Sequence, residues 1–193
     1  MRWTEVVGRI QACAAALFVM TGVATSQASA ATLIDFGGDK KADPYVQDGF
    51  SFAPARIVNG PCLSNGCLAL NDNETTGLSF LGASGLFSLS GLSFNLLGNG
   101  TGNALTVTGS NGTSLSYAVG DFAKNTYHTL SFGDAFADVS SILFSTGGGG
   151  NVRIDDLSAT PSPAPVPLPA AAWLLIGGVG TLAALRRRRP ASA

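Results

Sequence analysis

The most constraining feature of this sequence is a series of short segments in which apolar and polar residues alternate, between residues 31 and 159. Gly, Asn, Asp and Ser interrupt the alternation about every 8–12 residues, and no segment sustains a helical period over three turns. Alternation at period two is typical of strands with one buried face. We therefore predict one all-β domain over residues 31–159, an antiparallel β-sandwich of the jelly-roll type.

The expected strands follow directly from these segments. In chain order they are Thr32–Phe36, Gly49–Ala53, Arg56–Asn59, Cys67–Leu70, Gly77–Leu81, Leu86–Ser90, Leu92–Leu97, Ala104–Gly109, Ser114–Val119, Tyr127–Phe132, Val139–Ser145 and Val152–Leu157. The clearest hairpin runs from Leu105 to Val119, where Asn111-Gly112 predicts a two-residue type I′ turn. Phenylalanines at strand spacing are the expected core, in preference to a sugar-stacking surface: Phe50, Phe52, Phe80, Phe87, Phe94, Phe132, Phe136 and Phe144.

The distribution of charge argues against nucleic acid as a partner. Charged residues are only 12% of the chain, and 46% of its residues are hydrophobic. Residues 31–165 contain 5 basic and 11 acidic side chains, so the net charge of this portion is −6. A surface that binds phosphate backbones needs the opposite sign.

The N-terminal 30 residues have the three parts of a secretory signal peptide. Arg2 and Arg9 supply a positive region, and Ala12–Val23 is an apolar stretch too short to span a bilayer comfortably. Ala28-Ser29-Ala30 is a small-x-small cleavage site, so we expect signal peptidase to cut between Ala30 and Ala31 after the translocon has exported the chain. An uncleaved membrane anchor is the alternative.

The C-terminal region has three parts in a fixed order. Residues 160–169 form a proline-rich linker, and residues 170–185 contain no charge. Sixteen helical residues would reach about 24 Å, so we expect a single, short transmembrane helix over 170–185. The tail, residues 186–193, begins with the stop-transfer residues Arg186, Arg187, Arg188 and Arg189, which the positive-inside rule keeps cytoplasmic.

These C-terminal residues resemble a known sorting signal. Val166, Pro167, Leu168, Pro169 and Ala170, followed by an apolar helix with Trp173 and then an arginine cluster, are similar to the VPLPA-CTERM variant of the PEP-CTERM class in Gram-negative bacteria. The resemblance implies that an exosortase recognises the motif. It also implies cutting near the motif and delivery to the cell surface, in association with exopolysaccharide. A permanently membrane-anchored protein is the alternative fate.

The ordering of motifs in residues 31–159 also resembles galactose-binding-like, carbohydrate-module sandwiches. The resemblance rests on Leu33–Phe36, Asp48–Phe52 and the closing Ile154–Leu157. Such modules often hold a structural calcium ion between their first and last strands, and Asp155 matches the closing acid. Gly37 stands where the opening glutamate would be, so Asp35 and Asp39 are the substitutes to consider, with solvated turn residues as the alternative.

Two cysteines remain after removal of the signal peptide, Cys62 and Cys67. Four residues separate them, and Asn65-Gly66 favours a reversal of the chain. In an oxidising compartment we expect a local disulfide, and free thiols are the alternative. A zinc site is not expected, because His128 is the only histidine.

No catalytic constellation is evident, and we expect neither an enzyme nor a bound cofactor. His128 lies in an expected strand, where a surface or half-buried position is the simpler interpretation. Asp155 and Asp156 are adjacent and would point to opposite faces of a strand. We therefore predict an exported surface or extracellular-matrix protein with a structural or adhesive role. The alternatives are a carbohydrate-binding module, which would have polysaccharide as its partner, and a glycan-processing enzyme, which would need two converging carboxylates.

Overall fold

The computed structural model describes residues 29–98, 102–148, 151–164 and 175–182. The signal peptide up to residue 28, the sorting motif Val166–Ala170 and the arginines Arg186–Arg189 lie outside the described residues. Of the expected helix over 170–185, residues 175–182 are described and are helical. In the described part of the chain, no helix has both the length and the apolar character that crossing a membrane requires.

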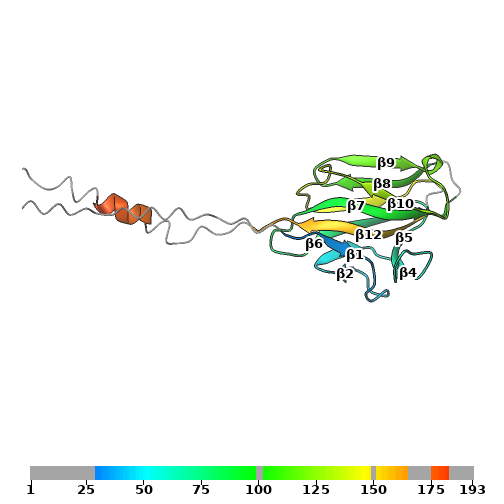
Figure 1. Cartoon of the computed structure of the whole chain (residues 1–193), viewed down its shortest axis with the longest axis horizontal. Coiled ribbons are helices and arrows are strands. Elements are labelled where there is room, and N and C mark those ends of the chain that lie inside the picture. The colour runs from blue at the N-terminus through cyan, green and yellow to red at the C-terminus, as the bar shows by residue number, and fades with distance from the viewer. Residues whose placement is uncertain (1–28, 99–101, 149–150, 165–174, 183–193) are drawn as a thin grey trace, which may run out of the picture.

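The folded domain consists of two six-stranded sheets whose named strands all pair in antiparallel fashion. Sheet A has the order β10 (Tyr127–Ser131), β7 (Phe87–Leu96), β12 (Val152–Pro161), β5 (Cys67–Leu70) and β4 (Ile57–Val58), and β1 (Thr32–Ile34) also pairs with β12. Sheet B has the order β2 (Tyr45–Gln47), β3 (Phe50–Ala53), β6 (Thr75–Phe80), β11 (Ser141–Ser145), β8 (Asn103–Gly109) and β9 (Ser114–Ala118). A 3-10 turn, η1 (Val119–Asp121), follows β9. The strands run along the long direction of the domain (Figure 1). The expected antiparallel β-sandwich is confirmed.

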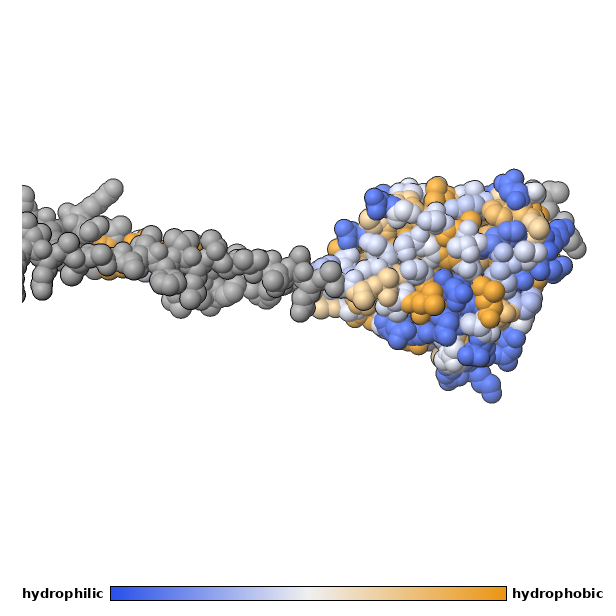
Figure 2. Space-filling model, in the orientation of Figure 1, coloured by the Kyte–Doolittle hydropathy of each residue, from blue (hydrophilic) through white to orange (hydrophobic). Residues whose placement is uncertain are grey.

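The core lies between the two sheets and is built largely from phenylalanine. Of the eight phenylalanines expected there, all are buried except Phe80, which is partly buried and packs against the cluster. Phe36 and Tyr45 are also fully buried and contact each other, with ring centroids 5.6 Å apart. On the face seen in Figure 2, hydrophobic and hydrophilic side chains are interspersed. The large apolar side chains are therefore mostly inside, as expected of alternating strands.

Strand β7 differs from the sequence expectation, which placed two strands at Leu86–Ser90 and Leu92–Leu97. It is one continuous strand, but the buried positions change phase within it: Phe87 and Leu89 face inward, and Leu92 and Phe94 face inward beyond Gly91. A β-bulge relative to β12 accounts for the shift. Gly91 is needed there, because a Cβ atom would lie 2.6 Å from the carbonyl oxygen of Leu130.

Three further differences concern turns and strand ends. The strand β2 was not expected, and β12 continues to Pro161, which pairs only with Phe87. The predicted type I′ turn at Asn111-Gly112 is wrong. Thr108 pairs with Ser114, which leaves five residues, 109–113, between the paired positions, and Gly112 alone among them has a positive φ, +85°. The amide of Gly109 donates to the carbonyl of Thr113 and closes this longer loop.

Candidate functional site

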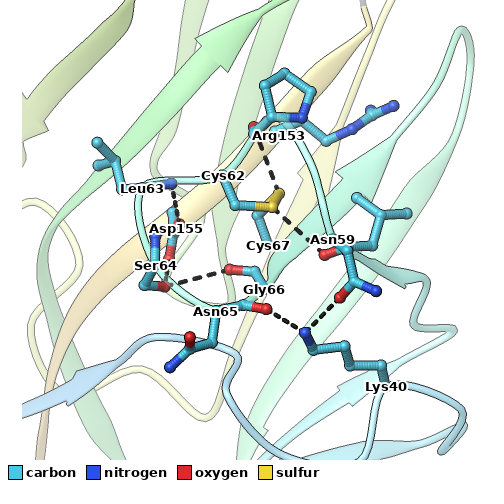
Figure 3. Close-up of a disulfide and its surroundings, with 12 residues drawn as sticks. Lys40, Asn59, Cys62, Leu63, Ser64, Asn65, Gly66, Cys67, Arg153 and Asp155 are labelled. Carbon is cyan, nitrogen blue, oxygen red and sulfur yellow. Dashed lines mark hydrogen bonds between the residues drawn. A yellow bond between two sulfur atoms is a disulfide. The ribbon is translucent and has the colours of Figure 1, made fainter.

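A disulfide-closed loop lies against the outer face of sheet A. Cys62 and Cys67 are bonded, which confirms the expected pairing (Figure 3). The bond closes a loop with a sequence separation of 5, and on the chain-entropy model such a loop stabilises the fold by about 2 kcal/mol. Cys67 is the first residue of β5, so the loop is fixed directly to the sheet.

The loop is also held by Asp155, a fully buried residue of β12. The Asp155 Oδ2 atom accepts hydrogen bonds from the amides of Leu63 at 2.8 Å and Ser64 at 3.1 Å. Its Oδ1 atom accepts one from the Ser64 hydroxyl at 3.0 Å and one from the amide of Asp156 at 2.9 Å. Figure 3 shows Asp155 between Leu63 and Ser64. One carboxylate thus joins a loop to a strand that is about 90 residues away in sequence.

Two contacts join the same loop to the N-terminal segment. The Lys40 ammonium group donates to the Asn59 side chain and to the Asn65 carbonyl. Gly66 is buried so closely against this segment that an added Cβ atom would lie 2.4 Å from the carbonyl oxygen of Phe36. Glycine is therefore required at position 66 by the approach of the two backbones.

The acids that the sequence offered for calcium have other partners. Asp35 Oδ1 accepts hydrogen bonds from the Gln47 side-chain amide and the Gly37 amide, and these bonds lower the pKa of Asp35. Both oxygens of Asp155 are occupied by the loop, and Asp39 Oδ1 caps the amide of Lys41. Among the described residues, no group of three or more His, Cys, Asp or Glu side chains is placed to bind a metal ion.

A row of side chains crosses the outer face of sheet A beside the loop. Tyr127 of β10 pairs with Asn95 of β7, Asn95 pairs with Arg153 of β12, and Arg153 pairs with Ala69 of β5. The amide of Ala69 donates to the carbonyl of Arg56, which extends the row to the segment before β4. We call Tyr127, Asn95, Arg153, Ala69 and Arg56 the cross-strand row. It brings together residues from five separate parts of the chain.

Two buried polar atoms in the middle of the row have no hydrogen-bond partner among the residues that the structure describes. They are Asn95 Oδ1 and Arg153 Nε, and Asn95 as a whole is only 3% exposed. The Arg153 Nη1 atom donates to the Asn151 side chain at 2.8 Å and to the Val152 carbonyl at 2.9 Å. Burial, followed by the nearby positive charge of Arg56, lowers the pKa of Arg153. Buried polar atoms are almost always hydrogen-bonded, so these two atoms are exceptions within the described part of the domain.

The row ends in a small surface cavity of about 170 Å³. Arg56, Ala69 and Glu74 are among its lining residues, together with Pro54, Ala55, Thr75 and Thr76. Arg56 and Glu74 form an ion pair at 3.2 Å, with nearly half of each side chain exposed. The row therefore contains an aromatic ring, an amide and two guanidinium groups, and the cavity at its end adds the carboxylate of Glu74.

The sequence did not predict this row, and it predicted no catalytic residue. His128, expected to be a surface or half-buried residue, is half-buried; its Nε2 atom lies 2.8 Å from the Ala123 carbonyl oxygen, and its ring contacts Phe94 and Phe122. Asp156 adopts a positive φ of 49° at a bulge of β12. Burial and the neighbouring Asp155 raise the pKa of Asp156. Asn95 and Arg153 were visible in the sequence only as polar residues within apolar strands.

Two-sheet antiparallel sandwiches form a broad structural class, and several solved structures similar to this chain are carbohydrate-binding modules. The xylan-binding domain CBM22-1 of Paenibacillus barcinonensis Xyn10C is 14% identical, with a TM-score of 0.39 over 72% of this chain and 98% of that domain. A family 29 module, CBM29-2, is 15% identical, with a TM-score of 0.41 over 67% of this chain and 91% of its own. A module that recognises mannan, TmCBM27, is 12% identical, with a TM-score of 0.36 over 69% of this chain and 100% of its own. No protein-family model and no curated protein matches the sequence. At these TM-scores the likeness is distant, so function has to be argued from this chain's own residues.

Tyr127 provides a test of how firmly the loop covers the row. Its hydroxyl donates to the Pro61 carbonyl at 2.9 Å, and burial, followed by the charge of Asp155, raises its pKa from 10.0 to about 12. A raised pKa of an acidic group means that the folded state favours the neutral phenol. This contribution to stability is therefore complete below pH 10.0 and is lost as the pH rises towards about 12.

We expect the free energy of unfolding to fall over this alkaline range, because the unfolded chain ionises Tyr127 more readily. Chemical denaturation at a series of pH values measures the slope of the free energy of unfolding against pH. Tyr127→Phe should reduce it, and Tyr117→Phe is the matched control at a tyrosine with a smaller rise in pKa. An equal slope in wild type and Tyr127→Phe would show that the phenol is not held as described.

Proposed function

We propose that this chain is an exported, non-catalytic protein that binds extracellular polysaccharide through the cross-strand row. The observation that carries the proposal is the pair of unpartnered buried atoms, Asn95 Oδ1 and Arg153 Nε, at the centre of the row. A sugar ring presents hydroxyl groups that both donate and accept hydrogen bonds. Asn95 is buried and Arg153 only partly so, which makes the guanidinium of Arg153 the group of the two that such a hydroxyl can reach.

The surroundings of these atoms support a sugar over other ligands. Tyr127 is half-buried, so the apolar face of a sugar can pack against the exposed part of its ring. The exposed ion pair of Arg56 and Glu74 supplies both charge signs, so the row does not select strongly for an anion or a cation. A polyhydroxylated neutral ligand satisfies such a mixed set of donors and acceptors.

Affinity electrophoresis of the full chain in gels containing xylan, mannan, β-glucan or the host's own exopolysaccharide tests the proposal. We expect retardation by at least one polysaccharide, and a loss of about tenfold or more in affinity for Arg153→Ala, since hydrogen bonds to charged groups contribute about 1.5–3 kcal/mol. Ser90→Ala is the matched control, because Ser90 is an exposed residue of β7 outside the row. Failure to bind any of the polysaccharides, or equal binding by the Arg153 variant, would refute the proposal.

We further propose that the chain is exported and sorted by its two terminal signals. The support is the sequence: a signal peptide ending at Ala30, and the motif Val166–Ala170 before an apolar stretch and four arginines. In this proposal the translocon and signal peptidase act first, and an exosortase acts near the motif. The folded domain then reaches the cell surface or the extracellular matrix.

The mass of the intact, surface-exposed species tests the sorting. We expect a species that begins at Ala31 and lacks Trp173 and the arginines Arg186–Arg189. A Pro167→Ala, Pro169→Ala double variant should accumulate with its C-terminal segment attached. If the wild type retains that segment, the protein is permanently anchored and the exosortase proposal is wrong. The binding proposal is tested separately, by affinity electrophoresis.

A further inference from the structure

Asparagine followed by glycine is the dipeptide in which an asparagine side chain loses ammonia most readily. The backbone nitrogen of the glycine attacks the side-chain carbonyl carbon of the asparagine, and glycine has no side chain to hinder this approach. The described part of the chain contains three such dipeptides, Asn59-Gly60, Asn65-Gly66 and Asn111-Gly112, and Asn99-Gly100 lies outside it. Since the dipeptides are identical, the structure around each one decides how readily it reacts.

Asn111-Gly112 is held in place by hydrogen bonds. The Nδ2 atom of Asn111 donates to the Ala135 carbonyl at 3.0 Å, and its Oδ1 atom accepts from the Thr113 amide at 3.0 Å. The amide of Gly112 donates to the Gly109 carbonyl at 3.0 Å. The leaving nitrogen and the attacking nitrogen are therefore both engaged, and the reaction has to break these bonds first.

Asn65-Gly66 is restrained by packing. The side chain of Asn65 is exposed, but Gly66 is buried, and an added Cβ atom on it would lie 2.4 Å from the carbonyl oxygen of Phe36. The backbone of Gly66 has to rotate before its nitrogen can face the Asn65 side chain. A close-packed neighbour opposes that rotation, so this dipeptide is also protected.

Asn59-Gly60 lies between β4 and the disulfide loop and has neither restraint. Both residues are exposed, and no atom lies within 4 Å of a Cβ position built on Gly60. Among the described residues, nothing accepts a hydrogen bond from the Gly60 amide. The nitrogen that has to attack is therefore free to turn toward the Asn59 side chain.

A cation lies at the carbonyl group that would be attacked. The Lys40 ammonium group donates a hydrogen bond to the Oδ1 atom of Asn59 (Figure 3). A positive charge at this oxygen makes the carbonyl carbon more electrophilic, and it stabilises the negative charge that develops on the oxygen during the attack. We propose that Asn59 is a site of spontaneous deamidation and that Lys40 promotes the reaction.

Water is the only co-reactant that this chemistry needs. The Gly60 nitrogen loses its proton to solvent and bonds to the Cγ atom of Asn59, while the bond from Cγ to Nδ2 breaks and Nδ2 leaves as ammonia with a proton from solvent. The resulting succinimide then adds water across one of its two ring C–N bonds. Opening at Cγ gives aspartate at position 59, and opening at the main-chain carbonyl carbon gives isoaspartate.

Either product alters the support of the disulfide loop. Both place a carboxylate beside the Lys40 ammonium group, so a neutral acceptor becomes a charged one and the hydrogen bond becomes stronger. Isoaspartate also inserts one more carbon into the main chain shortly before Pro61, whose carbonyl accepts the hydrogen bond from Tyr127. Aged molecules therefore differ from new ones in the charge and the path of the chain at this loop.

Mass spectrometry of the full chain, incubated in detergent micelles at mildly alkaline pH, tests the proposal. Fragmentation of the digested peptides assigns the mass increase, from loss of NH₂ and gain of OH, to a particular asparagine. We expect Asn59 to convert about tenfold faster or more than Asn111, because Asn111 first has to break hydrogen bonds that contribute about 1 kcal/mol each. Asn65 should also be slow. In urea the differences should largely disappear, since only the folded structure distinguishes the three sites.

Variants at position 40 test the part assigned to the lysine. Lys40→Met should slow the conversion of Asn59 about threefold or more, a modest factor because solvent screens an exposed charge. Lys40→Arg retains the cation and should restore most of the rate. Lys41→Met is the matched control, since Lys41 is the exposed neighbouring lysine, and it should leave the rate unchanged. Circular dichroism checks that each variant is folded.

The proposal is overturned if Asn65 or Asn111 converts as fast as Asn59 in the folded chain. It is equally overturned if Asn59 stays intact in the folded chain while it converts in urea. Equal rates at Asn59 in the wild type and Lys40→Met, or equal slowing by Lys40→Met and Lys41→Met, would refute the part assigned to Lys40.

Discussion

Replacement of Asp155 by alanine is expected to lower the free energy of unfolding by about 3 kcal/mol or more, because a buried carboxylate that accepts several hydrogen bonds would be lost. The carboxylate accepts from the amides of Leu63 and Ser64, from the Ser64 hydroxyl and from the amide of Asp156. Alanine would leave these donors without an acceptor and release one side of the loop. Urea denaturation of the full chain with the disulfide intact measures the change.

Asp156→Asn is the matched control for this experiment. Asp156 is adjacent and acidic, and asparagine tolerates its positive φ of 49°. Burial and the charge of Asp155 raise the pKa of Asp156, so the folded state disfavours its charge and a neutral replacement should cost little. A loss of less than about 1 kcal/mol for Asp155→Ala, or an equal loss for both variants, would contradict the role assigned to Asp155.

The loop held by Asp155 also positions the cross-strand row. Tyr127 donates to Pro61, which immediately precedes Cys62. Releasing the loop therefore removes a partner of Tyr127 as well as the cover over one end of the row. We infer that the disulfide and Asp155 act together: one closes the loop, and the other fixes it to the strand that carries Arg153.

The local pattern of the sequence predicts most strands, because alternation reports which residues face the core. It predicts two strands where β7 is one, because the alternation breaks at Gly91, and a bulge produces the same break as a turn. It misses β2, whose three residues are too few to show a period. The disulfide is predictable because its loop is short and needs no knowledge of the tertiary fold.

The site is harder to predict for a physical reason. Tyr127, Asn95 and Arg153 meet only because strands distant in sequence pair in one register. The bulges at Gly91 and Asp156 alter which face each following residue occupies, and a shift by one residue would turn Asn95 inward. Asp155 likewise shows that the tertiary fold decides which partners a side chain has. Its motif matches a calcium-binding position, but in the structure its carboxylate oxygens accept hydrogen bonds from the loop.

Phe52→Ala is expected to lower the free energy of unfolding by about 3–5 kcal/mol, because it removes a fully buried aromatic ring and leaves a cavity. The Phe52 ring lies 5.1 Å from that of Phe36 and 6.2 Å from that of Tyr45, measured between centroids. Phe36 follows β1 of sheet A, whereas Tyr45 and Phe52 belong to β2 and β3 of sheet B. The three rings therefore join the N-terminal strand to the opposite sheet.

This placement predicts more than a loss of stability. Hydrogen exchange of the β1 amides, Thr32–Ile34, should become faster in Phe52→Ala by a larger factor than exchange in β8, because β1 loses its support from the opposite sheet. Phe52→Leu, which retains most of the volume, should lose less than half as much free energy. Leu33→Ala, a change at an exposed residue of β1, is the control and should have little effect on either measurement. Uniform acceleration of exchange across both sheets would show that the ring cluster stabilises the whole sandwich equally and does not specifically hold the N-terminal strand.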